Sequence, residues 1–237
     1  MEKRRLDKLL GDSGLYSRKD AKALIRRGKV LVGGVAARAG DQKVSFGEPV
    51  TVDGVPIRNQ PHLYIMMNKP AGVLSATRDR NGKTALELLP PELRRKGLFP
   101  AGRLDKDTEG FLLITDDGAF AHRILSPKSH VPKTYLCTLD KPFDFQAVQS
   151  AFASGLQLGG GDVCSPAQLT LWKNAQNPQV EIVIFEGMFH QIKRMFVQFS
   201  LEVVYLKRVK IGGLELDENL PIGGSKEILH KDFLKIC

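Results

Sequence analysis

The sequence has few cysteines and no long apolar run. Cys137, Cys164 and Cys237 are an odd number without a C-x-x-C pair, which argues against a disulfide framework and a zinc knuckle and favours a reducing compartment. The apolar runs are only as long as strands, so no membrane span is predicted. The first residues lack an uninterrupted apolar core, which argues against a secretory signal. We therefore expect a cytoplasmic protein that does not contact a membrane.

Motifs for nucleotide cofactors are also absent. Neither GxGxxG nor GxxxxGK[ST] occurs in the sequence, and these are the patterns that mark dinucleotide and phosphate sites. The five histidines are scattered without the spacing of metal ligands. We interpret four of them as structural or surface residues: His62, His122, His130 and His230. No cofactor and no metal is expected.

Positive charge is concentrated at the start of the chain. The 237 residues have a formal net charge of +9, and residues 1–38 contain eleven Lys or Arg and only four Asp or Glu. A local surplus of this kind is typical of nucleic-acid-binding modules. A solvated basic face on any soluble protein explains the charge equally well. The length suits one large domain, or a small domain joined to a larger one.

Residues 1–58 have the pattern of a small helical and β module. Leu6, Leu9 and Leu10 have helical spacing, Ser17 and Asp20 form a capping-box signal for a second helix, and short strands follow. The stretch "RLDKLL…SRKDAKALIRRGKVLVGG" resembles the S4 RNA-binding domain. That resemblance implies a set of RNA-binding residues: Arg5, Ser17, Arg18, Lys19, Lys22, Arg26, Arg27 and Lys29.

A polar, proline-containing segment, residues 59–63, is the predicted linker to a second domain over residues 64–237. Strand and helix patterns alternate irregularly in that domain. They include a short helix over 84–90, a helix over 189–199 and a C-terminal helix over 225–236. This order favours an α+β fold with a mixed, mainly antiparallel sheet.

An acidic stretch, "GRLDKDTEGFLLITDDG" at residues 102–118, has nearly the spacing of an EF-hand loop from Asp105 onwards. Its second half is the apolar run "FLLIT", which offers no oxygen ligands, and its twelfth position is Asp116 rather than glutamate. Calcium is therefore excluded. We expect Asp107 and Glu109 to be exposed turn residues, whereas Asp105 lies in a loop that leads directly into a buried strand, where catalytic groups are often held.

The same stretch carries a specific resemblance. "AGRLDKDTEGFLLITDDG" is similar to the GRLDxxTxGLLLLTNDG signature of pseudouridine synthases that act on ribosomal RNA, with Phe111 and Asp116 as departures. The family's other blocks follow in order as "NKPAG" (68–72), "KTYL" (133–136) and "EGMFHQIKRM" (186–195). With the S4-like module in front, the resemblance covers nearly the whole chain and is closest to the small-subunit, or RsuA, type.

The resemblance assigns three catalytic roles. Asp105 is the carboxylate that attacks C1′ or takes a proton from the ribose, Lys193 is the cation that keeps it ionised, and Tyr135 stacks on the target base. A helical wheel independently places Lys193 beside the apolar stripe of Phe189, Ile192, Met195, Phe196 and Phe199, with His190, Gln191, Arg194 and Gln198 opposite. An ordinary surface lysine and a core tyrosine are the alternatives.

Four further residues are implied to contact substrate: Arg103, Asn68, Lys69 and Arg194. Arg103 supports the loop or contacts the RNA backbone. Asn68, Lys69 and Gly72 shape the wall of the cleft, and a simple strand-to-turn role for "NKPAG" is the alternative.

The sequence therefore predicts an isomerase that converts a uridine in 16S ribosomal RNA, free or within an assembly intermediate, to pseudouridine, and that acts as a monomer. The alternatives are a synthase acting on large-subunit ribosomal RNA, an RNA-binding protein of the S4 type without activity, and a metal-dependent nuclease that uses the acidic cluster.

Overall fold

The structure, a computed structural model, describes residues 3–233 and 235–236, without the side chains of Pro127, His230 and Lys231. Cys237 and the side chain of His230 therefore lie outside the described part. The chain packs as two compact units, one comprising the residues up to Leu63 together with Pro90–Leu98, the other Tyr64–Leu89 together with the residues from Phe99 onwards. None of the described helices is long and apolar enough to cross a membrane.

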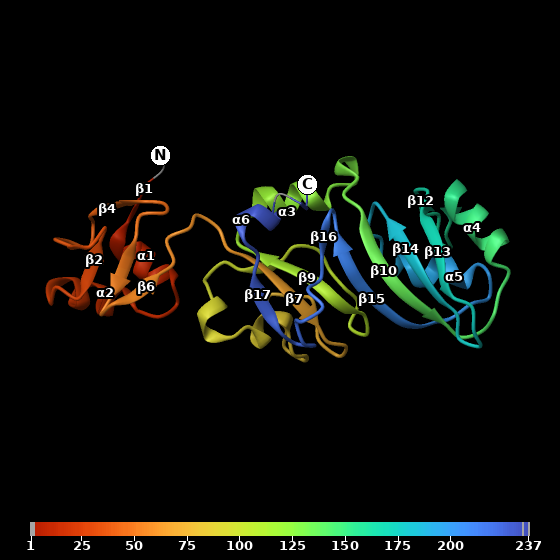
Figure 1. Ribbon diagram of the computed structural model, residues 1–237, viewed down its shortest axis with the longest axis horizontal. Coiled ribbons are helices and arrows are strands. Elements are labelled where there is room, and N and C mark those ends of the chain that lie inside the picture. The colour runs from red at the N-terminus through yellow and green to blue at the C-terminus, as the bar shows by residue number, and fades with distance from the viewer. Residues whose placement is uncertain (1–2, 234, 237) are drawn as a thin grey trace. The chain divides into compact units, whose positions relative to one another are not determined.

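The first unit combines two helices with short strands (Figure 1). In chain order its elements are β1 (Lys3–Arg5), α1 (Leu6–Asp12), α2 (Arg18–Arg26), β2 (Val30–Val32), β3 (Val35–Ala36), β4 (Lys43–Ser45), β5 (Val50–Val52), β6 (Val55–Ile57) and the 3-10 turn η2 (Pro91–Leu93). Strands β3, β2, β5 and β6 form one antiparallel sheet, and β1 pairs with β4.

Helix α2 is amphipathic and capped as its sequence predicts. Ser17 accepts a hydrogen bond from the backbone N–H of Asp20, whose side chain bonds back to Ser17, so the capping box is present. Ala21 and Ile25 are buried against the leucines of α1. The opposite face carries Lys19, Lys22 and Arg26, all exposed, at spacings that align them on one side of the helix.

The predicted linker is part of the packed first unit. Asn59 is buried and donates to the backbone carbonyls of Ser45 and Glu48, while Arg4 donates to its side-chain oxygen. Arg95 donates to the carbonyls of Gln60 and Pro61. Asn59 therefore uses its polar side chain inside the unit, whereas Gln60 and Pro61 are exposed and contribute only backbone carbonyls.

The second unit is built on one large sheet (Figure 1). Its strands are β7 (Tyr64–Lys69), β8 (Phe99–Pro100), β9 (Glu109–Thr115), β10 (Lys133–Leu139), β13 (Gln168–Lys173), β14 (Gln179–Ile184), β15 (Val203–Ile211), β16 (Leu214–Glu215) and β17 (Ser225–Glu227), with the pair β11 (Leu156–Gln157) and β12 (Val163–Cys164) outside it. Its helices are α3 (Gly118–Leu125), α4 (Phe145–Ser154), α5 (Gln191–Val197) and α6 (His230–Phe233), with the 3-10 turns η1 (Ala85–Leu88) and η3 (Pro127–Ser129).

The main path of the sheet runs β13-β14-β10-β15-β9-β7-β17. All of its pairs are antiparallel except β15 with β9, which confirms the expected α+β fold with a mainly antiparallel sheet. Helices α4 and α5 lie beside the β13–β14 end in Figure 1 and contact each other through Phe152 and Phe196. At the other end α3 and α6 pack on β7 and β9 through Phe120, Phe233 and Phe111.

Two predicted helices differ from the structure. Residues 225–227 form strand β17, which pairs with β7, and among the described residues of this segment the helix is limited to His230–Phe233. The helical pattern over 225–236 was overridden because an edge of the sheet was available for pairing. Residues 85–88 form a 3-10 turn rather than an α-helix, since Pro90 and Pro91 end the segment after four residues.

The parallel pair β9–β15 requires a close approach at Gly110. This residue has a φ of 98°, and a Cβ there would lie 2.2 Å from the carbonyl oxygen of Arg208. Glycine permits both the left-handed backbone and the contact. The two strands at the centre of the sheet can therefore meet directly after the loop that contains Asp105.

We expect Gly110→Ala to lower the free energy of unfolding by about 3 kcal/mol or more, because the methyl group clashes with the backbone and the φ is unfavourable. Urea unfolding checks this. Gly118→Ala is the matched control, because a Cβ at Gly118 meets no atom within 4 Å. Equal stability of the two variants would contradict the close approach.

Candidate active site

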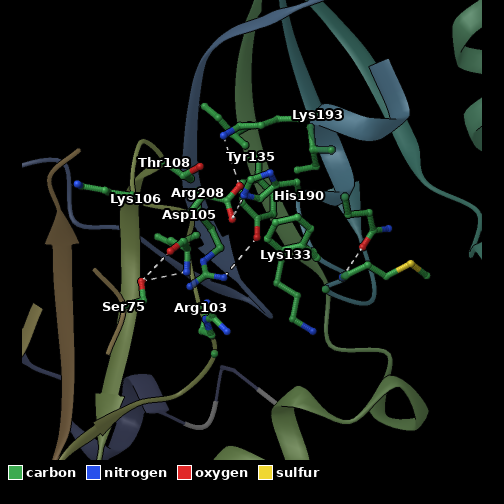
Figure 2. Close-up of a pocket in the computed structure, with 18 of the residues that line it drawn as sticks. Ser75, Arg103, Asp105, Lys106, Thr108, Lys133, Tyr135, His190, Lys193 and Arg208 are labelled. Atoms are coloured by element: carbon green, nitrogen blue, oxygen red, sulfur yellow. Dashed lines mark hydrogen bonds and ion pairs between the residues drawn. The ribbon is translucent and has the colours of Figure 1, made fainter. Parts of the chain in front are cut away.

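A cleft of about 690 Å³ opens over the middle of the large sheet (Figure 2). It is lined by the loop of residues 102–106 with Thr108, by side chains of β10 and β15, and by the segment from Glu186 to Lys193 that leads into α5. Three stretches that are far apart in the sequence therefore meet at one place, because β9, β15 and β10 are neighbours in the sheet.

Asp105 lies in this cleft between two basic side chains. Its Oδ2 is 3.4 Å from Nζ of Lys193, and its Oδ1 is 3.5 Å from Nε2 of His190. Figure 2 shows the three side chains pointing toward one another. The side chain of Asp105 is 27% exposed, so it is open to the cleft on one side and faces the two basic side chains on the other. The structure thus brings Asp105 and Lys193 together, as the sequence predicted.

Lys193 has a second and closer carboxylate partner. Its Nζ donates to both oxygens of Asp107, at 2.6 and 2.7 Å, and these bonds hold the pKa of Asp107 below its ordinary value. Asp107 is 72% exposed, as expected for a turn residue. The sequence did not indicate this ion pair, because only the fold shows that α5 begins opposite the loop. The ammonium of Lys193 is therefore shared by two carboxylates.

The loop that carries Asp105 is held by hydrogen bonds from the strand β7 and the turn after it. Nζ of Lys69 donates to the carbonyls of Lys106 and Thr108, at 3.3 and 2.8 Å, and to that of Pro70. Ser75 donates to the carbonyl of Leu104 and accepts from its N–H. The loop therefore has a fixed path on both sides of Asp105.

Asn68 and Lys69 do not line the cleft, which corrects the expectation that they shape its wall. Lys69 is fully buried, and Asn68 is buried and donates to the carbonyl of Leu220. The alternative for "NKPAG", a structural role where the strand turns, is the one that the contacts support. Gly72 contributes in the same way, because its N–H donates to the carbonyl of Lys106.

Tyr135 and Arg208 face each other across β10 and β15. Tyr135 is buried at the base of the cleft, and Nη1 of Arg208 donates to its hydroxyl at 3.3 Å. Nε of Arg208 donates to the carbonyl of Phe111. Lys133 also lines the cleft, and burial lowers its pKa to about 8. Sequence reasoning missed Arg208, although an arginine at an inward position of an apolar strand is a usable signal.

The segment around α5 departs from the predicted helical wheel. The helix begins only at Gln191, so Phe189 lies outside it and is exposed rather than part of the apolar stripe. Gln191 is buried and bonds to Glu186 and to the N–H of Met188, although it was expected on the polar face. His190 is the second basic neighbour of Asp105, although the sequence had suggested no role for it.

The remaining predicted substrate residues divide into two groups. Arg103 is exposed and lines the cleft. Arg194 does not line it, because its guanidinium pairs with Asp162 at 2.8 Å and donates to the carbonyls of Gly159 and Phe189. Arg194 attaches α5 to the loop before β12, and its contact with substrate stays a prediction.

In the first unit, six of the residues predicted to bind RNA are exposed: Arg18, Lys19, Lys22, Arg26, Arg27 and Lys29, which pairs with the exposed Asp53 at 3.0 Å. The other two have structural partners. Arg5 makes a bidentate pair with the buried Asp7, and Ser17 caps α2. Among the described residues no group of three His, Cys, Asp or Glu is arranged to hold a metal ion. Cys137 and Cys164 are buried free thiols.

Lys69 makes the stability of the fold depend on pH. Burial lowers its pKa from 10.5 to about 8, so between these values the unfolded chain binds more protons and stability rises with pH. We expect the free energy of unfolding of the wild type to rise, relative to that of Lys69→Met, between about pH 7 and about pH 9.5. Urea unfolding at both pH values measures it, with Lys128→Met as the exposed control. A difference that is constant with pH would contradict the burial of a charged Lys69.

Comparison with known proteins supports one family over the whole chain. Residues 63–198 match the family described as RNA pseudouridylate synthase, and residues 4–50 match the S4 domain. The chain is 44% identical over 230 residues to an uncharacterised RNA pseudouridine synthase of Bacillus subtilis (strain 168), with 96% of each chain covered. It is 38% identical to the ribosomal small subunit pseudouridine synthase A of Escherichia coli (strain K12), covering 98% of this chain and 99% of that one.

A solved pseudouridylate synthase has the same fold. Its crystal structure superposes with a TM-score of 0.66 at 33% identity and covers 99% of this chain and 100% of its own. The matched regions contain most of the S4-like first unit and all residues that line the cleft except Leu206 and Arg208. The chain therefore belongs to the RNA pseudouridine synthase family, with an N-terminal S4 domain.

Proposed function

We propose that this enzyme converts one specific uridine of small-subunit (16S) ribosomal RNA to pseudouridine. Its relatives from Escherichia coli and Vibrio cholerae, 38% identical over nearly the full chain, carry the name ribosomal small subunit pseudouridine synthase A. The basic face of α2 supports an RNA partner, because a row of exposed cations attracts phosphates. We also propose that the enzyme works as a monomer in the cytoplasm, on free RNA or on an assembly intermediate.

The reaction breaks the N1–C1′ bond of the target uridine and forms a C5–C1′ bond, while the proton on C5 is lost and N1 gains one. Asp105 either attacks C1′ or removes a proton from the ribose, and both routes need an ionised carboxylate. The observation that carries the proposal is the 3.4 Å approach of Lys193 to Asp105 inside a cleft large enough for a nucleoside. The ammonium lies close enough to orient the carboxylate toward the cleft and to attract its negative charge.

Tyr135 and Arg103 complete the proposed site. A uridine cannot react within a stacked helix, and extruding it costs about a few kcal/mol. The ring of Tyr135 at the base of the cleft offers the extruded base a stacking surface, and its hydroxyl can accept the C5 proton. Arg103 on the cleft wall is positioned to contact a phosphate of the bent backbone.

We expect Asp105→Asn to abolish pseudouridine formation, because an amide can neither attack C1′ nor take a proton. Release of tritium from C5-labelled small-subunit ribosomal RNA measures turnover directly. Asp116→Asn is the control, since Asp116 lies in the same acidic stretch but not in the cleft. Tritium release by Asp105→Asn at the wild-type rate would remove the central assignment. Carbodiimide treatment and primer extension then map which uridine is modified.

We expect removal of charge from α2 to reduce the salt dependence of RNA binding. The variant carries Lys19→Gln, Lys22→Gln and Arg26→Gln, and each lost phosphate contact lowers the slope of log K against log salt by roughly 0.7 to 0.9. Affinity for small-subunit ribosomal RNA over a salt series measures it.

The control for that experiment replaces three exposed lysines of the second unit that do not line the cleft, Lys128, Lys141 and Lys173. This control variant has the same net charge as the α2 variant. If the slope of log K against log salt changes only in the α2 variant, the lost contacts are local contacts between α2 and phosphates. Equal slopes for the two variants would contradict RNA binding by the S4-like unit.

A further inference from the structure

Phe189 is an apolar side chain at the edge of the cleft that the catalytic roles leave unused. It lines the cleft, yet it is 74% exposed, the highest value among the large hydrophobic residues that the structure describes as exposed. Leaving a phenyl ring in water is unfavourable, because the ring forgoes the free energy that burial of its apolar area would provide. An exposed ring at the entrance of a binding site is therefore a candidate contact for the ligand.

The ring is held in a defined orientation by its neighbour. Phe189 stacks on the imidazole of His190, with 3.9 Å between the ring centroids and 15° between the planes. His190 has a left-handed backbone with a φ of 48°, and its Nε2 lies 3.5 Å from Asp105. One face of the phenyl ring is thus covered by His190, while the high exposure of Phe189 leaves the opposite face open to solvent.

This geometry suits a flat aromatic ligand group. Bases of unpaired RNA bind proteins by stacking on aromatic side chains, whatever their sequence. When a uridine is extruded into the cleft, the bases next to it each lose a stacking partner on one side. A fixed ring at the rim of the cleft can replace one lost partner and offset part of the cost of extrusion.

We propose that Phe189, supported by His190, is a stacking platform for the nucleotide that flanks the target uridine in the substrate RNA. This inference rests on the proposed function and names a subsite of it. The platform contributes to binding of the RNA and to extrusion of the uridine, whereas Asp105 and Lys193 act on the ribose. It is thus separate from Tyr135, which lies at the base of the cleft and is buried.

A second exposed aromatic residue provides the matched control. Trp172 is 61% exposed on β13, an edge strand, and does not line the cleft. Its removal takes away a comparable apolar area from the surface without touching the entrance. Two substitutions at position 189 separate stacking from general hydrophobic contact: Phe189→Leu retains much of the apolar area but no ring, and Phe189→Trp retains a larger ring.

The experiment uses the full chain and a short RNA centred on the uridine that primer extension maps in small-subunit ribosomal RNA. Affinity is measured with variants that also carry Asp105→Asn, so that the RNA is not converted. KM and kcat are measured with the same variants when Asp105 is retained. We expect Phe189→Ala and Phe189→Leu to weaken affinity and raise KM by roughly ten- to a hundred-fold, while Phe189→Trp stays near the wild type and Trp172→Ala is unchanged.

The decisive arm changes the RNA rather than the protein. We replace the base on the 5′ side, and in a second RNA the base on the 3′ side, by an abasic site. One of these RNAs should bind the wild type more weakly by the same factor as Phe189→Ala, and with that RNA the Phe189→Ala variant should show no further loss. This pattern identifies the flanking base that occupies the platform.

Three outcomes would overturn the platform: a Phe189→Ala variant with unchanged affinity and KM, a Phe189→Leu variant that behaves like the wild type, or a penalty that persists with both abasic RNAs. The proposed function fails in a different way, if the wild type forms no pseudouridine in small-subunit ribosomal RNA. In that case no uridine is mapped and the short RNA cannot be designed, so the affinities of Phe189→Ala and Trp172→Ala for a single-stranded RNA of mixed sequence decide whether the ring stacks on a base.

Discussion

The approach of a lysine ammonium to one half-buried carboxylate is the interaction on which the structure of the site depends. Lys193 reaches Asp105 from the first turns of α5, and Asp105 stands on a loop that enters β9. Removing a carboxylate from water is unfavourable unless a nearby cation compensates for the lost hydration. Much of the second unit can be understood as holding these two groups together. Gly110 lets β9 meet β15, Lys69 and Ser75 fix the backbone of the loop, and Gln191 and Arg194 anchor the start of α5.

The site is also divided between rigid and open parts. Tyr135 and Arg208 lie on adjacent strands and are buried, so the base of the cleft is fixed by the sheet. Arg103 and Phe189 line the cleft and are exposed, and Asp107, in the same loop as Asp105, is exposed next to it. Lys193 connects the two parts, because it pairs both with Asp105 inside the cleft and with Asp107 at its edge. This arrangement suits a reaction on a sugar held deep in the site, with the rest of a long polyanion remaining outside.

The fold class could be predicted because short apolar runs and irregularly alternating strand and helix patterns are local features of the sequence. The pair of Asp105 and Lys193 was assigned by resemblance to the family's motifs, and the loop position of Asp105 and the helical wheel around Lys193 only supported it. Phe189, Gln191 and Asn68 were misplaced for a different reason. Whether they are buried depends on where α5 begins and on what packs against β7, and neither is encoded within a few residues. The strand at 225–227 was missed because its partner β7 lies far away in the chain. Asn59 and Lys69 show that a polar residue can serve an internal hydrogen-bond network as readily as a surface.

The most direct test of the account is the rate of a single turnover, measured with enzyme in excess over labelled RNA, for the wild type, Lys193→Met and Lys193→Arg. Methionine retains the length of the side chain and removes the charge, whereas arginine retains the charge in another shape. If the charge of the ammonium orients and stabilises the catalytic carboxylate, Lys193→Met slows the reaction by roughly a hundred-fold or more, Lys193→Arg retains a substantial part of the rate, and both bind RNA nearly as well as the wild type. A wild-type rate for Lys193→Met would contradict the account.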